Sequence, residues 1–214
     1  MISRIYDRTI RPVLPRKIGV FSGVAVRRPK LFDLTDHVSD YKAGMIGEID
    51  ARIIPGDDVS LIAGGLGVSS VRAARAGGNV VAYEGARQMV RTSRETIETN
   101  YLGDGSVKVK HAIVGEAIDL YGDADGARII PPSNLDPGDV LVLDCEGAER
   151  SILSGIKEWP RTVVCEEHPG FGVPAEETIS LLEQHYSRVY TVENYPTRPD
   201  DCERVVVATG GDGQ

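Results

Sequence analysis

The chain has 214 residues, of which 41% are hydrophobic and 26% charged, and its formal net charge at pH 7 is −8. These values are typical of one globular domain, and no apolar run approaches the roughly 18 residues that a membrane-spanning helix needs. The N-terminus also lacks the continuous apolar block of a secretory signal, so we expect a cytoplasmic protein with no integral membrane segment.

Charge is distributed unevenly along the chain. Residues 1–30 carry eight basic residues and one acidic residue, a net charge of +7, which leaves −15 on the remainder. An acidic body with a short basic arm is not expected to bind nucleic acid over a broad face. The arm itself has several interpretations: a solvated segment packed along the body, or a contact with an anionic substrate, a membrane surface or the acidic body of a second subunit in a homo-oligomer.

The first 37 residues lack a clear hydrophobic period and are interpreted as a basic N-terminal extension. Within them, residues 18–26 have the β-branched content of a strand pair turned at Ser22 and Gly23. Apolar residues of the segment 38–54 recur every three or four positions, which predicts an amphipathic helix that stops at Pro55. The main domain is therefore expected over residues 38–209, followed by a flexible tail at 210–214.

Residues 58–84 predict a strand, a glycine-rich turn, a helix and a second strand that ends on Glu84. Glycines at positions 64, 65 and 67 let a ligand approach the backbone at the N-terminus of the helix, and Glu84 lies where a ribose-binding acid is expected. NAD and S-adenosylmethionine share the ribose hydroxyls that such an acid accepts. This unit therefore predicts a nucleotide-type cofactor and leaves a nicotinamide-dependent oxidoreductase and a methyltransferase open.

The rest of the chain alternates between predicted strands and helices. Such alternation specifies a doubly wound, mostly parallel α/β sheet with helices on both faces, whose ligands bind at the C-terminal ends of the strands. We expect helices over 86–100, 147–156 and 174–186, and strands over 107–114, 139–144, 161–166, 188–192 and 204–208. Residues 115–138 are rich in turn formers and are expected to form a small excursion, a hairpin over the sheet.

Two kinds of side chain in this sequence could bind a metal ion, the cysteines and the carboxylates. Cys145, Cys165 and Cys202 are odd in number and lie far apart, inside or beside apolar runs, which favours reduced, buried thiols over a disulfide framework or a zinc site. The carboxylates match no metal-binding motif by their spacing, so no metal site is predicted.

One segment separates the two cofactor classes. Residues 139–156, DVLVLDCEGAERSILSGI, resemble the FkbM family of S-adenosylmethionine-dependent methyltransferases, whose hallmark is a strand ending in an acid, one residue, and then Glu-Gly-Ala-Glu at the start of a helix. The likeness extends more weakly to the glycine turn, to Ala112 and to residues 163–169, and covers about residues 40–195. The positions that fit the hallmark are Asp144, Glu146, Gly147, Ala148, Glu149, Leu153 and Gly155.

The resemblance implies the class I methyltransferase fold, a seven-stranded Rossmann-like sheet with the last strand antiparallel, and S-adenosylmethionine as the cofactor. It implies methyl transfer to a hydroxyl of a small molecule, sugar or glycan. Asp144 is expected to position the acceptor, and Glu146 or His168 to accept its proton. The cofactor is expected to contact Ala63, Gly64, Gly65, Gly67, Glu84, Gly85, Ala112 and Asp144.

The chain departs from the family's pattern in two places. Leu61 and Ala63 stand where the glycine turn usually begins with an acid and a glycine, and Val142 stands where many members carry a lysine. A non-catalytic relative that keeps the fold as a binding module therefore stays open. An NAD(P)-dependent oxidoreductase is the other alternative, although the chain is short for a separate substrate domain and has no Tyr-x-x-x-Lys pair.

Overall fold

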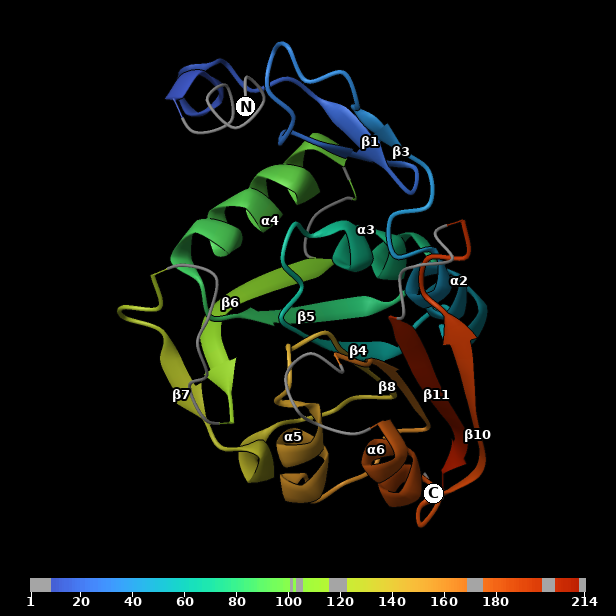
Figure 1. Ribbon diagram of the computed structural model, residues 1–214. Helices are drawn as coiled ribbons and strands as arrows, with labels where there is room; N and C mark the ends of the chain where they lie inside the picture. The colour runs from blue at the N-terminus through green and yellow to red at the C-terminus, as the bar shows by residue number, and fades with distance from the viewer. Residues whose placement is uncertain are drawn as a thin grey trace.

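A computed structural model describes residues 9–100, 102, 106–115, 123–168, 175–197 and 203–211. Its main sheet is formed by β4 (Asp58–Ile62), β5 (Asn79–Glu84), β6 (Val107–Val114), β7 (Arg128–Ile130), β8 (Val140–Leu143), β9 (Thr162–Glu166), β10 (Tyr186–Glu193) and β11 (Arg204–Gly211). These eight strands lie in the order β10-β11-β9-β8-β4-β5-β6-β7 (Figure 1).

Every pair of neighbouring strands in this sheet is parallel except at β11, which runs antiparallel to both β9 and β10. The predicted doubly wound, mostly parallel sheet with a reversed last strand is therefore confirmed. The sheet has one strand more than the seven expected. The expectation of a hairpin over the sheet is wrong for residues 128–130, which form β7 and pair in parallel with the otherwise open edge of β6.

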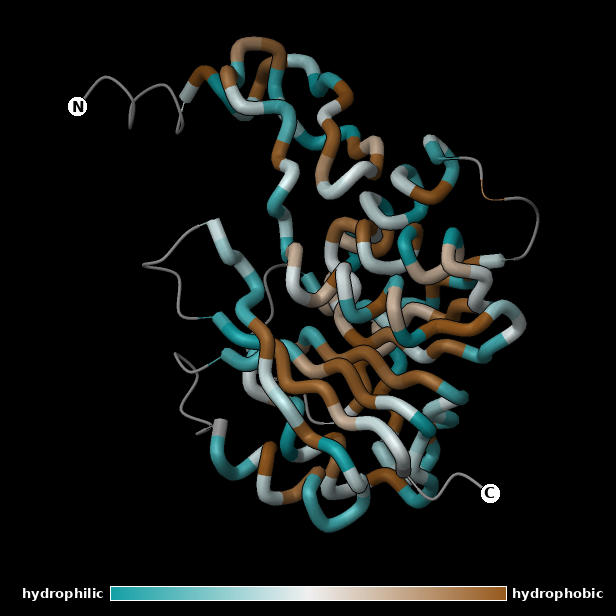
Figure 2. Tube along the Cα trace, turned by 90° about the vertical axis from the view of Figure 1, so that its right-hand side faces the viewer, coloured by the Kyte–Doolittle hydropathy of each residue, from teal (hydrophilic) through white to brown (hydrophobic). Residues whose placement is uncertain are grey.

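Helices cover both faces of the sheet. On one face lie α2 (Ala43–Arg52), α3 (Val68–Arg75) and α4 (Arg87–Asn100), and on the other α5 (Glu149–Gly155) and α6 (Ala175–Leu182) (Figure 1). Alternate residues of β8 enter the two cores: Val140 and Val142 pack with the first set of helices, Leu141 and Leu143 with the second. Burial on both faces explains the unbroken apolar runs, which appear as hydrophobic central strands in Figure 2.

The N-terminal region forms a second sheet of β1 (Gly19–Phe21), β2 (Val24–Val26) and β3 (His37–Val38), in the order β2-β1-β3. The predicted turn is confirmed: Ser22 and Gly23 have φ values of +44° and +77°, the left-handed pair that a tight hairpin turn requires. The buried side chains of β2 pack on α3 and α4, on the side of these helices away from the main sheet, so this small sheet packs against the main body (Figure 1). The predicted helix begins at Ala43, later than expected, because Val38 pairs in β3.

Several remaining expectations concern single residues and the chain ends. Cys145 and Cys165 are buried free thiols, as predicted, whereas Cys202 lies outside the described residues. Strand β11 continues to Gly211, two residues into the predicted tail, and residues 212–214 are not among those described. In the described ranges, no helix is both long and apolar enough to cross a membrane. The domain boundaries at 37 and 209 stay predictions.

Candidate functional site

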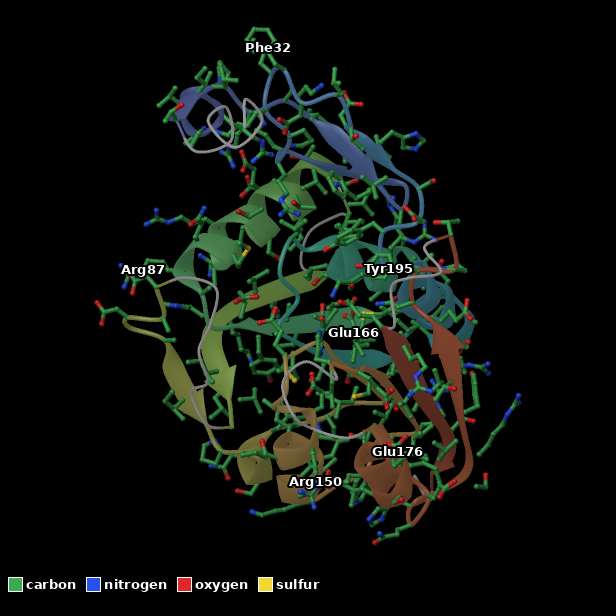
Figure 3. The ribbon with its side chains drawn as sticks, in the orientation of Figure 1. Phe32, Arg87, Arg150, Glu166, Glu176 and Tyr195 are labelled. Carbon is green, nitrogen blue, oxygen red and sulfur yellow. The ribbon has the colours of Figure 1, made fainter. Side chains whose placement is uncertain are left out.

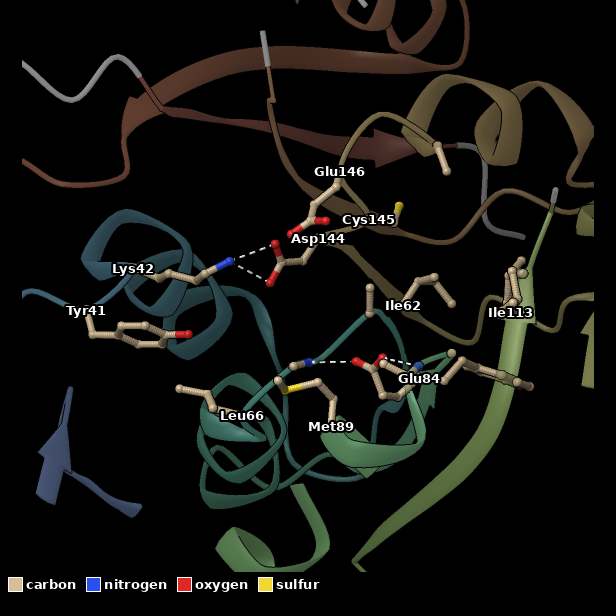
Figure 4. A pocket seen from close by; sticks show the side chains of 18 of the residues that line it. Tyr41, Lys42, Ile62, Leu66, Glu84, Met89, Ile113, Asp144, Cys145 and Glu146 are labelled. Carbon is tan, nitrogen blue, oxygen red and sulfur yellow. Dashed lines mark hydrogen bonds and ion pairs between the residues drawn. The ribbon is translucent and has the colours of Figure 1, made fainter. Parts of the chain in front are cut away.

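A pocket of about 440 Å³ opens where β4, β5, β6 and β8 end (Figure 4). Its volume lies within the range of cofactor and small-molecule sites, and strand ends are where doubly wound sheets bind ligands. Of the residues predicted to form the site, Gly64, Gly67 and His168 do not line the pocket. Those that line it are Ala63, Gly65, Glu84, Gly85, Ala112, Asp144 and Glu146.

The glycine turn after β4 has two structural roles. A Cβ on Gly65, whose φ is +49°, would meet no atom within 4 Å, so the space above this residue is open. A Cβ on Gly67, whose φ is +84°, would lie 2.8 Å from the Ser93 hydroxyl and 3.0 Å from Ser93 Cα. Gly65 therefore faces the ligand space, whereas Gly67 lets α3 pack closely on α4.

Alanine substitutions should separate these two roles. We expect Gly67→Ala to lower the free energy of unfolding by about 2 kcal/mol or more, because a left-handed residue gains a methyl group that collides with Ser93. Gly65→Ala should cost only about 1 kcal/mol, for the left-handed backbone alone. Urea denaturation of both variants measures the difference, and equal losses would contradict the packing role of Gly67.

Glu84, at the end of β5, is held by the turn that it faces. Its Oε2 accepts a hydrogen bond from the Gly65 N–H (N···O 3.0 Å) and its Oε1 accepts one from the Ala86 N–H (2.8 Å) (Figure 4). The residue is 6% exposed, and burial raises the pKa of its carboxyl while these backbone donors oppose the rise. Each oxygen keeps a second lone pair, so Glu84 can accept two further hydrogen bonds from a ligand.

Asp144, directly after β8, belongs to an ion-paired cluster drawn from distant parts of the chain. Lys42 Nζ donates to both Asp144 oxygens (2.7 and 2.6 Å) (Figure 4). It also donates to Glu166 Oε2 (2.5 Å), a residue whose place in the molecule Figure 3 labels. The Asn194 amide donates to Glu166 Oε1 (2.5 Å), and its oxygen accepts from the Met45 N–H (3.2 Å). The sequence did not predict Lys42 or Asn194 as site residues, because neither lies in a local motif.

Lys42 is the cation that the two acids of this cluster share. Burial alone lowers the pKa of Lys42, but the two carboxylates outweigh it and hold that pKa well above the ordinary 10.5. Glu166 is 1% exposed, and burial, followed by the charge of Asp144, raises its pKa, which Lys42 opposes. Lys42 therefore remains a cation that fixes the Asp144 carboxylate at the pocket wall.

The Glu-Gly-Ala-Glu segment is a tight loop that places Glu146 at the pocket. Glu149, the first residue of α5, accepts hydrogen bonds from the Cys145 N–H (3.2 Å) and the Gly147 N–H (2.8 Å). Glu146 lies between them in a left-handed conformation with φ +51°. Burial is the largest influence on Glu146 and raises the pKa of its carboxyl. Glu149 thus stabilises the loop, and Glu146 presents an acid with a raised proton affinity.

His168 follows β9 and lies beside two of these acids. Its Nδ1 is 2.9 Å from Glu149 Oε1 and its Nε2 is 3.7 Å from Asp144 Oδ1. Asp144, Glu166 and His168 also offer ligand atoms within 4.8 Å of one another, a grouping that suits a metal ion. The Lys42 ammonium already binds both carboxylates of that grouping, so it supplies the positive charge there.

The protonation of His168 should appear in the stability of the protein. Burial alone lowers the pKa of His168, but the Glu149 hydrogen bond and the Asp144 charge raise it above the ordinary 6.5. A raised folded-state pKa stabilises the fold at low pH, and this contribution is lost as the pH rises through that pKa. We therefore expect His168→Asn to lose more unfolding free energy at about pH 6 than at about pH 9. Urea denaturation at both values is the measurement, and a loss that grows with pH would contradict it.

No family model and no curated protein matches this chain, but solved structures do. A precorrin-6y C5,15-methyltransferase from Geobacter metallireducens has a TM-score of 0.52 at 14% identity, over 81% of this chain and 89% of that one. An S-adenosylmethionine-dependent O-methyltransferase from Thermotoga maritima has a TM-score of 0.56 at 16% identity, over 94% and 79%. TYW2 from Pyrococcus horikoshii, in complex with MeSAdo, has a TM-score of 0.54 at 11% identity, over 90% and 69%. The chain therefore has the Rossmann-like fold of class I S-adenosylmethionine-dependent methyltransferases.

Proposed function

We propose that this chain is an S-adenosylmethionine-dependent methyltransferase. The observation that carries the proposal is the strand-end pocket, in which open space above Gly65 adjoins the buried Glu84 carboxylate. Glu84 would accept the ribose hydroxyls, and the turn would let the rest of the cofactor lie against the backbone. Ala112, Ile113 and Val114 line the same pocket and offer apolar surface for the adenine.

The departures at the glycine turn are compatible with this fit. Leu61 is fully buried and packs in the core with α2 and α3, so its side chain takes no part in the pocket. Ala63 has a φ of +60°, the left-handed conformation that glycine adopts most readily. The turn therefore keeps its ligand-facing shape without the acid and the glycine that are usual in the FkbM family.

The residues around Asp144 suit methyl transfer to a hydroxyl. When bound, S-adenosylmethionine would supply a methyl group on a positively charged sulfur; an aligned oxygen would bond to the methyl carbon as the carbon–sulfur bond breaks and S-adenosylhomocysteine leaves. Asp144, fixed by Lys42, would orient the acceptor hydroxyl. Glu146 or His168 would accept its proton, because burial raises the proton affinity of Glu146 and contacts with Glu149 and Asp144 raise that of His168.

The acceptor that we propose is a small molecule, sugar or glycan, in keeping with the likeness of residues 139–156 to the FkbM family. Nucleic acid is not the acceptor that we expect, because the chain outside its first 30 residues carries a net charge of −15. A cytoplasmic location and a homo-oligomer also belong to the proposal.

Isothermal titration calorimetry with S-adenosylhomocysteine tests the cofactor. We expect saturable binding with one molecule per chain. If the protein has an intact fold by circular dichroism and still binds no S-adenosylhomocysteine, the proposal is wrong. NAD titrated into the same sample tests the oxidoreductase alternative, which binding of NAD alone would favour. Cofactor binding without methyl transfer to any hydroxylated acceptor would favour the binding module.

A further inference from the structure

Two basic side chains line the pocket, Arg28 and Lys42, and they differ in whether their charge is balanced. Lys42 is ion-paired with both Asp144 and Glu166 and is therefore neutralised within the protein. Across the part of the chain that the structure describes, no carboxylate forms an ion pair with the Arg28 guanidinium. Arg28 is thus the positive charge in this pocket that is left for a ligand.

Arg28 differs from the neighbouring basic residues of the N-terminal region, which have partners within the chain. The others at positions 11–30 neutralise acids of the chain or bind its carbonyl oxygens, so they stabilise the N-terminal sheet and its contact with α4. The ion pairs are Arg11–Asp33 (2.7 Å), Lys17–Asp36 (2.7 Å), Arg16–Glu95 (2.8 Å) and Arg27–Glu95 (3.7 Å), and Lys30 donates to the carbonyls of Pro12 and Leu14.

The backbone around Arg28 is held in place. The Arg28 N–H donates to the Val26 carbonyl (3.0 Å), and the Pro29 carbonyl accepts from the Lys17 N–H (2.7 Å). Val26 is fully buried where β2 packs on α3 and α4, and a residue before proline has few backbone conformations. The Arg28 side chain, which is exposed and lines the pocket, is therefore attached to a fixed backbone segment.

Arg28 lines the same pocket as Tyr41 and Lys42, and Lys42 is the residue that holds Asp144. Burial raises the pKa of the Tyr41 phenol, and the charges of Lys42 and Arg28 oppose that rise. Figure 4 shows Tyr41 and Lys42 on one side of the pocket and Ile113 on the other, with Glu84 and its hydrogen bonds to Gly65 and Ala86 on the wall between them. Tyr41 and Lys42 are thus set apart from the side proposed for adenine.

We propose that Arg28 is the anion-recognition residue of this pocket and that a molecule bound there presents a carboxylate or phosphate group to it. A guanidinium matches both groups with two parallel hydrogen bonds, and such charge-assisted bonds are stronger than neutral ones. The inference rests on the proposed methyltransferase function, which offers two sources of the anion. One is the carboxylate of the cofactor's methionine moiety, and the other is an anionic methyl acceptor, such as a hexuronic acid.

Arg28→Gln tests this inference, with Arg27→Gln as the matched control. Arg27 loses the same charge one position away, but its partner Glu95 lies on α4 and does not line the pocket. Calorimetry with S-adenosylhomocysteine and with methylthioadenosine, which lacks the carboxylate, tests the cofactor source. If that source is correct, Arg28→Gln weakens the affinity for S-adenosylhomocysteine by about 10-fold or more and leaves the affinity for methylthioadenosine unchanged.

The acceptor source is tested on protein saturated with S-adenosylhomocysteine, titrated with glucuronate, inorganic phosphate and glucose. If it is correct, the wild type prefers an anion over glucose by about 10-fold or more and Arg28→Gln loses that preference. Two results would overturn the inference. One is that the affinities of the wild type and Arg28→Gln agree within about two-fold for every probe, and the other is that Arg27→Gln loses as much affinity as Arg28→Gln. If the folded wild type binds no S-adenosylhomocysteine, the proposed function is wrong. The glucuronate and phosphate titrations, run without S-adenosylhomocysteine, would still decide the role of Arg28.

Discussion

Replacing Lys42 by methionine should cost about 3–5 kcal/mol of unfolding free energy, the usual penalty for removing one partner of a buried ion pair. The substitution leaves the carboxylates of Asp144 and Glu166 facing each other without the ammonium that now binds both. Glu166 is 1% exposed, so water cannot replace the lost partner. Guanidinium chloride denaturation followed by circular dichroism measures the loss.

The pH dependence of this variant identifies its cause. Without Lys42, the pKa of Glu166 should rise further, since burial and Asp144 already raise it and Lys42 opposes them. An acid with a raised folded-state pKa stabilises the fold when protonated, so Lys42→Met should gain stability as the pH falls and lose it as the pH rises through that pKa. The double variant Lys42→Met/Glu166→Gln removes the repulsion and should recover much of the loss. A single variant within about 1 kcal/mol of the wild type at pH 7 would show that the cluster is not needed for stability.

Glu84→Gln is expected to weaken S-adenosylhomocysteine binding by about 10- to 100-fold, because charge-assisted hydrogen bonds to the ribose become neutral or are lost. The glutamine amide has one oxygen for the two backbone donors, Gly65 N–H and Ala86 N–H, that the carboxylate now binds. The turn should therefore also lose about 1–2 kcal/mol of stability. Calorimetry measures the affinity, and urea denaturation measures the stability.

Glu98→Gln is the matched control, since it makes the same chemical change on the exposed side of α4 and should alter neither quantity. The shorter acid in Glu84→Asp keeps the charge and tests whether its position matters. Unchanged S-adenosylhomocysteine affinity in a folded Glu84→Gln protein would contradict the ribose-binding role of Glu84.

Much of the fold was predictable because its patterns are local. The succession of β4, glycine turn, α3 and β5 follows from apolar periodicity and from the glycines that a ligand needs to approach the backbone closely. The placement of Glu84 and Asp144 at neighbouring strand ends follows from the rule for parallel sheets, since every strand of the unit ends at the same edge. Strand β7 was missed because it is short and joins the sheet only through β6.

The partners of Asp144 were not predictable in this way. Lys42 lies 102 residues before Asp144 in the sequence, and no spacing rule connects them. Val142, which stands where FkbM members often carry a lysine, is fully buried against α2 and α3, so the amine beside Asp144 comes from the N-terminus of α2 and not from β8. Glu149 similarly proved to bind the loop and His168 together.

The sequence by itself determined the sheet class, the turn that faces a ligand and the strand ends where acids gather, since each depends on residues within one strand, turn or helix. Only the tertiary structure decided which charges meet. Lys42 is neutralised by Asp144 and Glu166, whereas Arg28 enters the same pocket without a carboxylate partner among the described residues. Charge balance depends on distances of a few ångströms between segments far apart in the chain. The packing of α2 on β9 and β11 brings Lys42 to the two acids, and the packing of β2 on α3 and α4 positions the segment that carries Arg28.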